Sequence, residues 1–302
     1  MPSGFINLGN TCYINAVLQC FLHCTPLNAL LNATTINPST PEQMFLKEYD
    51  DLRKMAQSGN VTVRPERFIH HIQLYAQHRK ILAFMKLGQN DVDEFIHFLV
   101  DAFHTAYCSE KAPDPATQSR AMVAGQFQSP IIQLFFGVHV HTVVKDGTDH
   151  VLASTPEPFF FLKLPIPDDA KNLVDCLHAY VASERMEHWR DDAGAIHCVQ
   201  RRCAFATLPP VLFISLKRFT ADIRKDSSVV DVPETLVVGH LTYTLAAVCV
   251  HNGHVGGGHY TACVRHESGW VCIDDDAIYP TTTPTKGGYC FVFLLEKTEK
   301  TT

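Results

Sequence analysis

Residues 4–19 of the chain read GFINLGNTCYINAVLQ. Within this stretch Ile14 and Leu18 recur at helical spacing, which predicts a helix. Thr11 is a residue type that commonly caps helix N-termini, so Cys12 is expected to be the first residue of the helix. The stretch therefore predicts a cysteine at a helix start, which is a chemically special position.

A cysteine at the first turn of a helix is favoured as a thiolate, because free backbone N–H groups and the helix dipole stabilise negative charge. The sequence thus predicts a lowered pKa and a nucleophilic Cys12. Gly9 and Asn10 permit a sharp turn before it, and the Asn7 side chain could reach the oxyanion formed when the sulfur attacks a carbonyl. The alternative is that Cys12 is one inert thiol of eleven and Asn7 a turn residue, so a base is needed elsewhere.

The candidate base is His259, which follows three glycines in residues 256–264, GGGHYTACV. One histidine among 17 carries little weight by itself, but this one opens a predicted strand beside a glycine loop that permits close backbone approach. The strand is expected to turn back at residues 267–269, and a two-residue turn there would pair His266 with Gly269. The return strand, residues 270–276, ends in three consecutive aspartates.

With a two-residue turn, His259 is expected to face Asp276, and Asp274 is its diagonal neighbour at roughly 7–8 Å between Cα atoms. Asp275 would point to the other face, whereas a longer turn or a bulge reverses this parity. A carboxylate on one ring nitrogen would fix the tautomer and leave the other nitrogen for the cysteine. The alternative is an acidic strand end without a catalytic role.

The order of predicted elements, helices first and mostly antiparallel strands later, indicates an α+β fold. Beyond the first helix we expect helices at about 41–56, 65–76, from 91 onward and at 173–184, and a loop at 109–119. We expect strands at 131–144, 159–164, 211–219, 241–251, 259–264, 270–273 and 289–295.

Five segments in the same order resemble those of ubiquitin-specific proteases, and the match runs across nearly the whole chain. Residues 7–19 resemble the Cys box of that family and residues 257–276 resemble its His box. Further matches are residues 89–95, 208–219 and 287–295. The resemblance implies a papain-like fold over residues 1–302, with a helical thumb at 1–120, a β palm at 121–302 and short fingers at roughly 126–150 and 190–235.

The resemblance also implies the reaction, which is hydrolysis of the (iso)peptide bond after the C-terminal glycine of ubiquitin. By position, Cys12 matches the nucleophile, His259 the general base and Asp274 the third member of the triad. Asn7 matches the oxyanion residue, and Asp275 matches a neighbouring acid that can assist. The implied partners are ubiquitin and ubiquitinated proteins, with the chain as a monomer.

Four residues are implied to contact the ubiquitin tail, namely Gln89, Asp91, Glu94 and Tyr260. In that family, acids of the segment matched by residues 89–95 hold arginines of the tail, and Tyr260 would line the narrow cleft. Here Asn90 replaces a second glutamine. Asp91 and Glu94 also fit a capping box at a helix start, so one carboxylate could cap the helix while the other faces the tail.

Many members of the family hold zinc at the fingertips with two Cys-x-x-Cys pairs, and here the first pair is missing. His139 and His141 lie near its expected place, and Cys198 and Cys203 are too widely spaced for the second pair. These four side chains could hold zinc, but the spacing is unusual. The sequence is therefore interpreted as having no metal or other cofactor, with these residues as relics or structural groups.

Composition and charge restrict the classes of partner and the cellular location that we expect. The net charge is −6 without a basic run, which argues against a nucleic-acid partner. No apolar stretch approaches the ~20 residues of a membrane span, and cysteines within apolar runs indicate reduced thiols of a cytoplasmic or nuclear protein. The alternatives to an active deubiquitinase are an inactive ubiquitin-binding module and a protease for another ubiquitin-like modifier.

Overall fold

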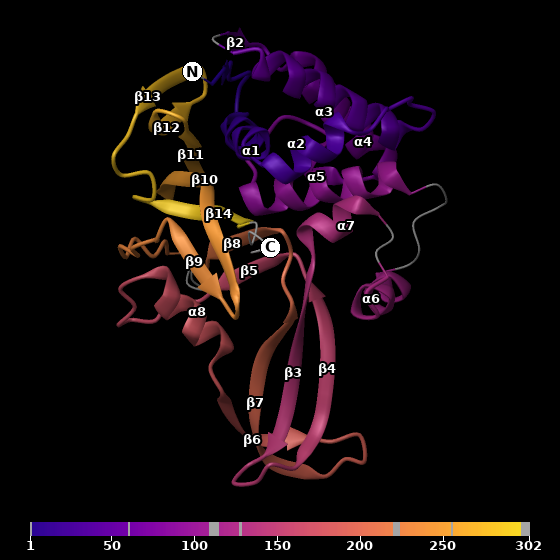
Figure 1. The fold of residues 1–302 in the computed structure, drawn as a ribbon, viewed down its shortest axis with the longest axis vertical. Helices are drawn as coiled ribbons and strands as arrows, with labels where there is room; N and C mark the ends of the chain where they lie inside the picture. Colours follow the sequence, from indigo (N-terminus) through magenta and orange to yellow (C-terminus); the bar gives the residue numbers. More distant parts are fainter. Residues whose placement is uncertain are drawn as a thin grey trace, which may run out of the picture.

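The fold is given by a computed structural model that describes residues 2–59, 61–108, 115–126, 129–219, 224–254 and 256–296. Figure 1 shows three parts: a helical lobe, a large sheet beside it, and a smaller sheet that extends away from both. Helices dominate the first half of the chain and strands the second, so the predicted α+β class is confirmed.

Most helices gather in one lobe around a shared aromatic and aliphatic core (Figure 1). Every residue of the first helix is buried, because this helix contacts helices α2 and α5 on one side and strands β10, β11 and β12 on the other. The helices are α1 (Cys12–Leu22), α2 (Thr25–Asn32), α3 (Pro41–Gln57), α4 (Glu66–Arg79), η1 (Leu82–Phe84), α5 (Val92–Tyr107), α6 (Pro115–Val123), α7 (Pro130–Phe135) and α8 (Leu173–Val181).

The large sheet has the strand order β13-β12-β11-β10-β14-β8-β5, with β9 paired to β10. Its pairings are antiparallel except for β5 with β8, which is parallel. The strands are β5 (Phe161–Leu164), β8 (Val211–Leu216), β9 (Thr235–Val238), β10 (Leu241–His254), β11 (Gly257–His266), β12 (Gly269–Asp274), β13 (Ala277–Pro280) and β14 (Gly288–Leu295). A short parallel pair, β1 (Gly4–Phe5) and β2 (Thr62–Val63), lies apart from it.

The smaller sheet has the order β4-β3-β7-β6, with antiparallel pairing throughout. It extends to the lower end of the molecule in Figure 1. Its strands are β3 (Gly137–Lys145), β4 (Val151–Phe159), β6 (Glu184–Arg190) and β7 (Ile196–Thr207). They occupy residues 137–159 and 184–207. These ranges overlap in part with residues 126–150 and 190–235, which the resemblance implied for the fingers.

The predicted helices are confirmed as α3, α4, α5 and α8. The strand predicted at 131–144 is wrong at its start, because Pro130–Phe135 forms α7 and the strand begins at Gly137. Ser129 caps this helix by accepting a hydrogen bond from the Ile132 N–H, and Pro130 fits its first turn. Both signals stand just before a long apolar run, in which periodicity does not distinguish a helix from a strand.

The loop predicted at 109–119 is also wrong in part. Residues 115–119 belong to α6, and residues 109–114 lie outside the described residues. Strand β4 was missed because it contains Pro156 and Pro158, which argue against a strand. It lies at the edge of its sheet, where prolines are tolerated because one side of the strand makes no ladder bonds.

No single helix in the described part of the chain is long and apolar enough to cross a membrane. Helices α1 and α2 meet the length and composition criteria only as a pair, which is bent by 75°.

A buried acid at the start of α5 predicts a pH-dependent stability. Asp93 accepts hydrogen bonds from the Ser215 hydroxyl (3.0 Å) and lies 3.3 Å from the Lys163 ammonium, but its Oδ1 atom is buried without a partner. Burial, followed by the charge of Asp91, raises the pKa of Asp93 from its ordinary value of 3.8 to about 6. That shift corresponds to about 3 kcal/mol.

Because the folded-state pKa is raised, this contribution is fully present below pH 3.8 and is lost as the pH rises through about 6. Asp93→Asn mimics the protonated acid, so the variant is expected to lose less stability than the wild type between about pH 3.5 and about pH 7.5, which bracket that window. Urea unfolding at several pH values measures this. Parallel stability curves for the two proteins would contradict the prediction.

Candidate active site

The turn before α1 is held by the side-chain carbonyl of Asn7. Its Oδ1 atom accepts hydrogen bonds from the Gly9 N–H (2.9 Å), the Thr11 N–H (3.3 Å) and the Thr11 hydroxyl (3.1 Å). Gly9 and Asn10 adopt positive φ angles of 92° and 55°. Glycine tolerates this conformation, and asparagine tolerates it better than most residues. The turn thereby places Cys12 at the start of α1.

Helix α1 begins at Cys12, as predicted. The predicted side-chain cap is wrong, because the Thr11 hydroxyl makes no bond to the helix N–H groups and instead accepts from the Leu8 N–H (2.9 Å). The first N–H groups of α1 therefore have no side-chain cap. Uncapped donors at a helix start can stabilise negative charge on a nearby atom.

The expected lowering of the Cys12 pKa is not found in this structure. Burial raises the pKa of the Cys12 thiol, and the negative charge of Asp275 raises it further. A hydrogen bond from the Tyr260 backbone N–H acts in the opposite direction but is outweighed by burial. The helix start favours the thiolate, as argued from the sequence. Burial of the sulfur has a larger and opposite effect on the pKa of Cys12.

This raised pKa predicts how the free protein reacts with a small alkylating reagent. Because the thiolate is the reactive form, iodoacetamide modification of Cys12 should be slow at neutral pH and rise steadily through alkaline pH. Mass spectrometry of the Cys12 peptide over a pH series measures the rate. A rate already at its plateau at neutral pH would show that the free protein holds a thiolate and would contradict the prediction.

The candidate base lies on β11, which pairs with β12 in the predicted register, His266 opposite Gly269. The His259 Nε2 atom lies 2.5 Å from Asp274 Oδ1, and both side chains are about 40% exposed, at 41% and 40%. Asp276, which was expected to face His259, is exposed in the turn, because β12 ends at Asp274. Asp274 therefore orients the ring and occupies one of its two nitrogens.

Asp275 links the turn before α1, α1 itself and β1 to the end of β12, although it was expected to point to the other face. It adopts a positive φ of 53°, which turns it out of the strand pattern. Its carboxylate accepts hydrogen bonds from the side-chain amides of Asn7 and Asn15, both at 2.8 Å, and its Oδ2 lies 4.0 Å from His259 Nε2. Its backbone carbonyl accepts from the Phe5 N–H (2.9 Å).

Asn15 was missed by sequence reasoning. The available signal was a polar residue within a fully buried helix, since such a side chain needs hydrogen-bond partners. Its amide joins the Phe5 carbonyl (3.2 Å) to the Asp275 carboxylate. The Asn7 amide donates to the same carboxylate, which leaves its second N–H available for another acceptor.

A cavity of about 290 Å³ opens at Cys12. Of the predicted residues, Cys12, Gln89, Asp91 and Tyr260 line this cavity; its other walls are Tyr13, Asn90, Phe219, His251, His254 and residues 256–258. His259 and Asp274 lie on the wall of a neighbouring cavity of about 830 Å³. His251 lines both cavities, so the two spaces adjoin.

Asp91 has two roles in this cavity. One carboxylate oxygen caps α5 by accepting from the Asp93 N–H (2.7 Å). The other accepts from the hydroxyls of Tyr260 (3.2 Å) and Tyr289 (2.9 Å), the second of which sequence reasoning did not single out. Glu94 is exposed and does not line the cavity. The structure thus places the capping carboxylate inside the cavity and the other acid on the surface.

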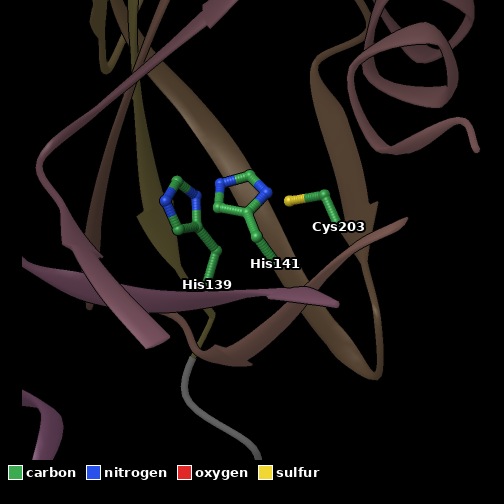
Figure 2. A group of neighbouring side chains, drawn as sticks. All are labelled: His139, His141 and Cys203. Atoms are coloured by element: carbon green, nitrogen blue, oxygen red, sulfur yellow. The ribbon is translucent and has the colours of Figure 1, made fainter. Parts of the chain in front are cut away.

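Of the four residues considered for zinc, three come together. His139, His141 and Cys203 place one ligand atom each within 4.8 Å of one another (Figure 2). Cys198 lies apart and donates its S–H to Asp146 Oδ2 (3.3 Å). A second such group is His259, Asp274 and Asp275, whose close approach is explained by the hydrogen bonds described above.

Several known proteins that are similar to this chain in sequence are ubiquitin carboxyl-terminal hydrolases. The chain is 26% identical to ubiquitin carboxyl-terminal hydrolase 17 of Arabidopsis thaliana, over 97% of this chain and 42% of that protein. It is also 26% identical to ubiquitin carboxyl-terminal hydrolase 10 of Xenopus tropicalis (92% and 44%) and 21 of Bos taurus (97% and 61%). The chain therefore spans less than half the length of the first two relatives.

Solved structures show the same fold. A SAGA DUB module containing Ubp8 and bound to monoubiquitin superimposes with a TM-score of 0.80 at 20% identity, covering 98% of this chain and 70% of that chain. A yeast SAGA DUB module matches with a TM-score of 0.78 at 22% identity, over 98% and 69%. The predicted papain-like architecture is thereby confirmed. A family model described as ubiquitin carboxyl-terminal hydrolase matches residues 3–293, and the chain belongs to this family.

Proposed function

We propose that this chain is a thiol-dependent deubiquitinase that hydrolyses the (iso)peptide bond after the C-terminal glycine of ubiquitin. The observation that carries the proposal is the position of Cys12, at an uncapped helix start on the wall of a cavity, with the His259–Asp274 pair on the strand that donates to its sulfur. The family membership supports the same chemistry.

The proposed reaction follows from the hydrogen bonds that His259 and Asn7 already make. Asp274 occupies His259 Nε2, so the other ring nitrogen accepts the proton of the Cys12 thiol as the sulfur attacks the carbonyl carbon. The free N–H of Asn7 and the N–H groups at the start of α1 stabilise the oxyanion. The imidazolium then protonates the leaving amine, and a water deprotonated by His259 hydrolyses the thioester.

The proposed substrate channel is the cavity of about 290 Å³. Residues 256–258 are three glycines and Tyr260 lies beside them, so a peptide with small residues fits best against this wall. Asp91 already accepts two hydroxyls and an N–H. The exposed carboxylate of Glu94 is therefore the freer partner for an arginine of the ubiquitin tail.

The proposal is tested with electrophilic probes built on different modifiers. The chain is incubated with ubiquitin carrying a C-terminal electrophile and, in parallel, with equivalent probes of other ubiquitin-like modifiers. We expect rapid adduct formation with ubiquitin at Cys12, identified by mass spectrometry. Preferential reaction with another modifier would change the substrate, and ubiquitin binding without any adduct would show a non-catalytic module.

A further inference from the structure

A second group of reactive side chains lies in the small sheet, away from the Cys12 cavity. His141 on β3 is the register partner of Cys203 on β7, and His139 lies two residues earlier on β3 and therefore on the same face. One ligand atom from each lies within 4.8 Å of the others. Figure 2 shows the His141 ring between His139 and the Cys203 sulfur.

A carboxylate from a third strand completes this group. Glu157 on β4 is the register partner of His139. Its Oε2 atom lies 3.7 Å from His139 Nε2 and 3.9 Å from His141 Nε2. The carboxylate thus faces the Nε2 side of both rings, next to the group formed by the two imidazoles and the thiol.

One nitrogen of the His139 ring has a partner that orients the ring, whereas one buried nitrogen of the His141 ring has no partner among the described residues. The Nδ1 atom of His139 contacts the Tyr180 hydroxyl of α8 (3.3 Å), which leaves Nε2 facing Glu157. The Nδ1 atom of His141 is buried and has no hydrogen-bond partner among the described residues. Buried polar atoms are normally paired, so this nitrogen lacks a partner that a metal ion would supply.

The two rings also lie close together, with their centroids 4.5 Å apart. Metal ions bind neutral imidazole and deprotonated thiol, so an ion at this position would displace the thiol proton of Cys203.

We propose that His139, His141 and Cys203 bind one zinc ion, with His141 binding through Nδ1. Glu157 faces the Nε2 side of the rings and its side chain is 55% exposed, so it turns toward the ion to become the fourth ligand. Imidazole and thiolate ligands suit zinc, whereas calcium and magnesium prefer oxygen ligands throughout. Zinc–ligand bonds of about 2.0–2.3 Å place tetrahedral ligand atoms roughly 3.5 Å apart, so small side-chain rotations close this group on the ion. The ion would tie β3, β4 and β7 together.

This position differs from the tips of the small sheet, where the family resemblance would place zinc. The hairpin turns that form the tips are residues 146–150 and 191–195. Cys203 lies near the opposite end of β7, beside α8 through the Tyr180 contact with His139. Cys198 lies nearer the tips and is held by Asp146, so the proposed site does not include it.

The test uses the whole chain in a Cys12→Ala background, so that the active-site thiol contributes nothing. Protein freed of metal with a chelator is titrated with zinc, and bound zinc is counted by mass spectrometry of the metal. A parallel titration with Co²⁺ follows the thiolate-to-metal charge-transfer absorption. We expect one ion per chain, the charge-transfer band, and a melting temperature that rises with zinc concentration.

Cys203→Ser is expected to abolish the charge-transfer band and to weaken zinc binding at least tenfold. His141→Asn should also weaken binding at least tenfold, and Glu157→Gln should weaken it less because water can replace the carboxylate. Cys198→Ser, on the same strand, is the matched control and should bind like the parent. Circular dichroism checks that each variant is folded.

Three results would overturn the proposal. The first is a parent chain that holds no more zinc than the His141→Asn and Cys203→Ser double variant. The second is loss of the charge-transfer band in Cys198→Ser rather than in Cys203→Ser. The third is a zinc-dependent melting temperature that persists in Glu157→Gln, His139→Asn and Cys203→Ser alike. None of these readouts depends on hydrolysis, so the proposed function stands or falls separately.

Discussion

Replacing Cys12 with alanine is expected to lower the rate of ubiquitin-amide cleavage by roughly 10⁴-fold or more, because the attacking atom itself is removed. Adduct formation with a ubiquitin electrophile should disappear at the same time. Ubiquitin binding should be kept, since Cys12 is one small, buried residue of the cavity wall. Cleavage of a fluorogenic ubiquitin amide and a separate binding measurement test both parts.

A different cysteine, which contacts a histidine, provides the matched control. The Cys108 sulfur lies 3.8 Å from both ring nitrogens of His104. Both His104 nitrogens are already engaged, by the Ser129 hydroxyl and the Gln118 amide at 2.8 Å each. Cys108→Ala should therefore leave cleavage unchanged. Cleavage that survives Cys12→Ala and is lost in Cys108→Ala would refute the assignment of the nucleophile.

Replacing Asp274 with asparagine is expected to lower kcat/KM by roughly 10²- to 10⁴-fold, because the ring loses the carboxylate that fixes its tautomer and stabilises the imidazolium. The structure favours Asp274 for this role, since it lies 2.5 Å from His259 Nε2 whereas Asp275 lies 4.0 Å away. Steady-state kinetics over a pH series measure the effect. The pH profile separates loss of the base from loss of substrate binding.

Asp275→Asn is the comparison variant for Asp274→Asn. Asparagine tolerates the positive φ at this position better than most residues, so the turn should survive. The variant loses one acceptor for the amides of Asn7 and Asn15, and we expect a fall of about tenfold from poorer oxyanion stabilisation. If Asp275→Asn proves at least as damaging as Asp274→Asn, while both variants keep the wild-type melting temperature, Asp275 is the partner of His259.

Local sequence signals predicted the elements that carry the site. The start of α1 at Cys12 and the pairing of β11 with β12 followed from helical spacing and from the short turn after His266. Helix α7 was missed because the residues after its cap form an apolar run, where strand and helix cannot be told apart by periodicity. Strands β6 and β7 were missed because most of their side chains are exposed, so no buried face marks them.

The sequence predicted residues that the structure places near one another, such as His259 and Asp274, but it did not predict the electrostatics around Cys12. Burial of Cys12 depends on packing between the helical lobe and the large sheet, which no local pattern states, so the direction of its pKa shift was wrong. The role of Asp275 was hidden because its positive φ takes it out of the alternation on which the parity argument relied. Three of the zinc candidates lie together only because the register aligns His141 with Cys203.

Helix α1 is fully buried between the helices and the strands of the large sheet. Neither half of the molecule can therefore melt without exposing the apolar surface of this shared element, which couples the two halves in one cooperative unit. Cys12 lies in a fully buried helix, whereas the side chain of His259, the proposed base, is 41% exposed. Movement of the imidazole therefore disturbs fewer buried contacts than movement of the sulfur.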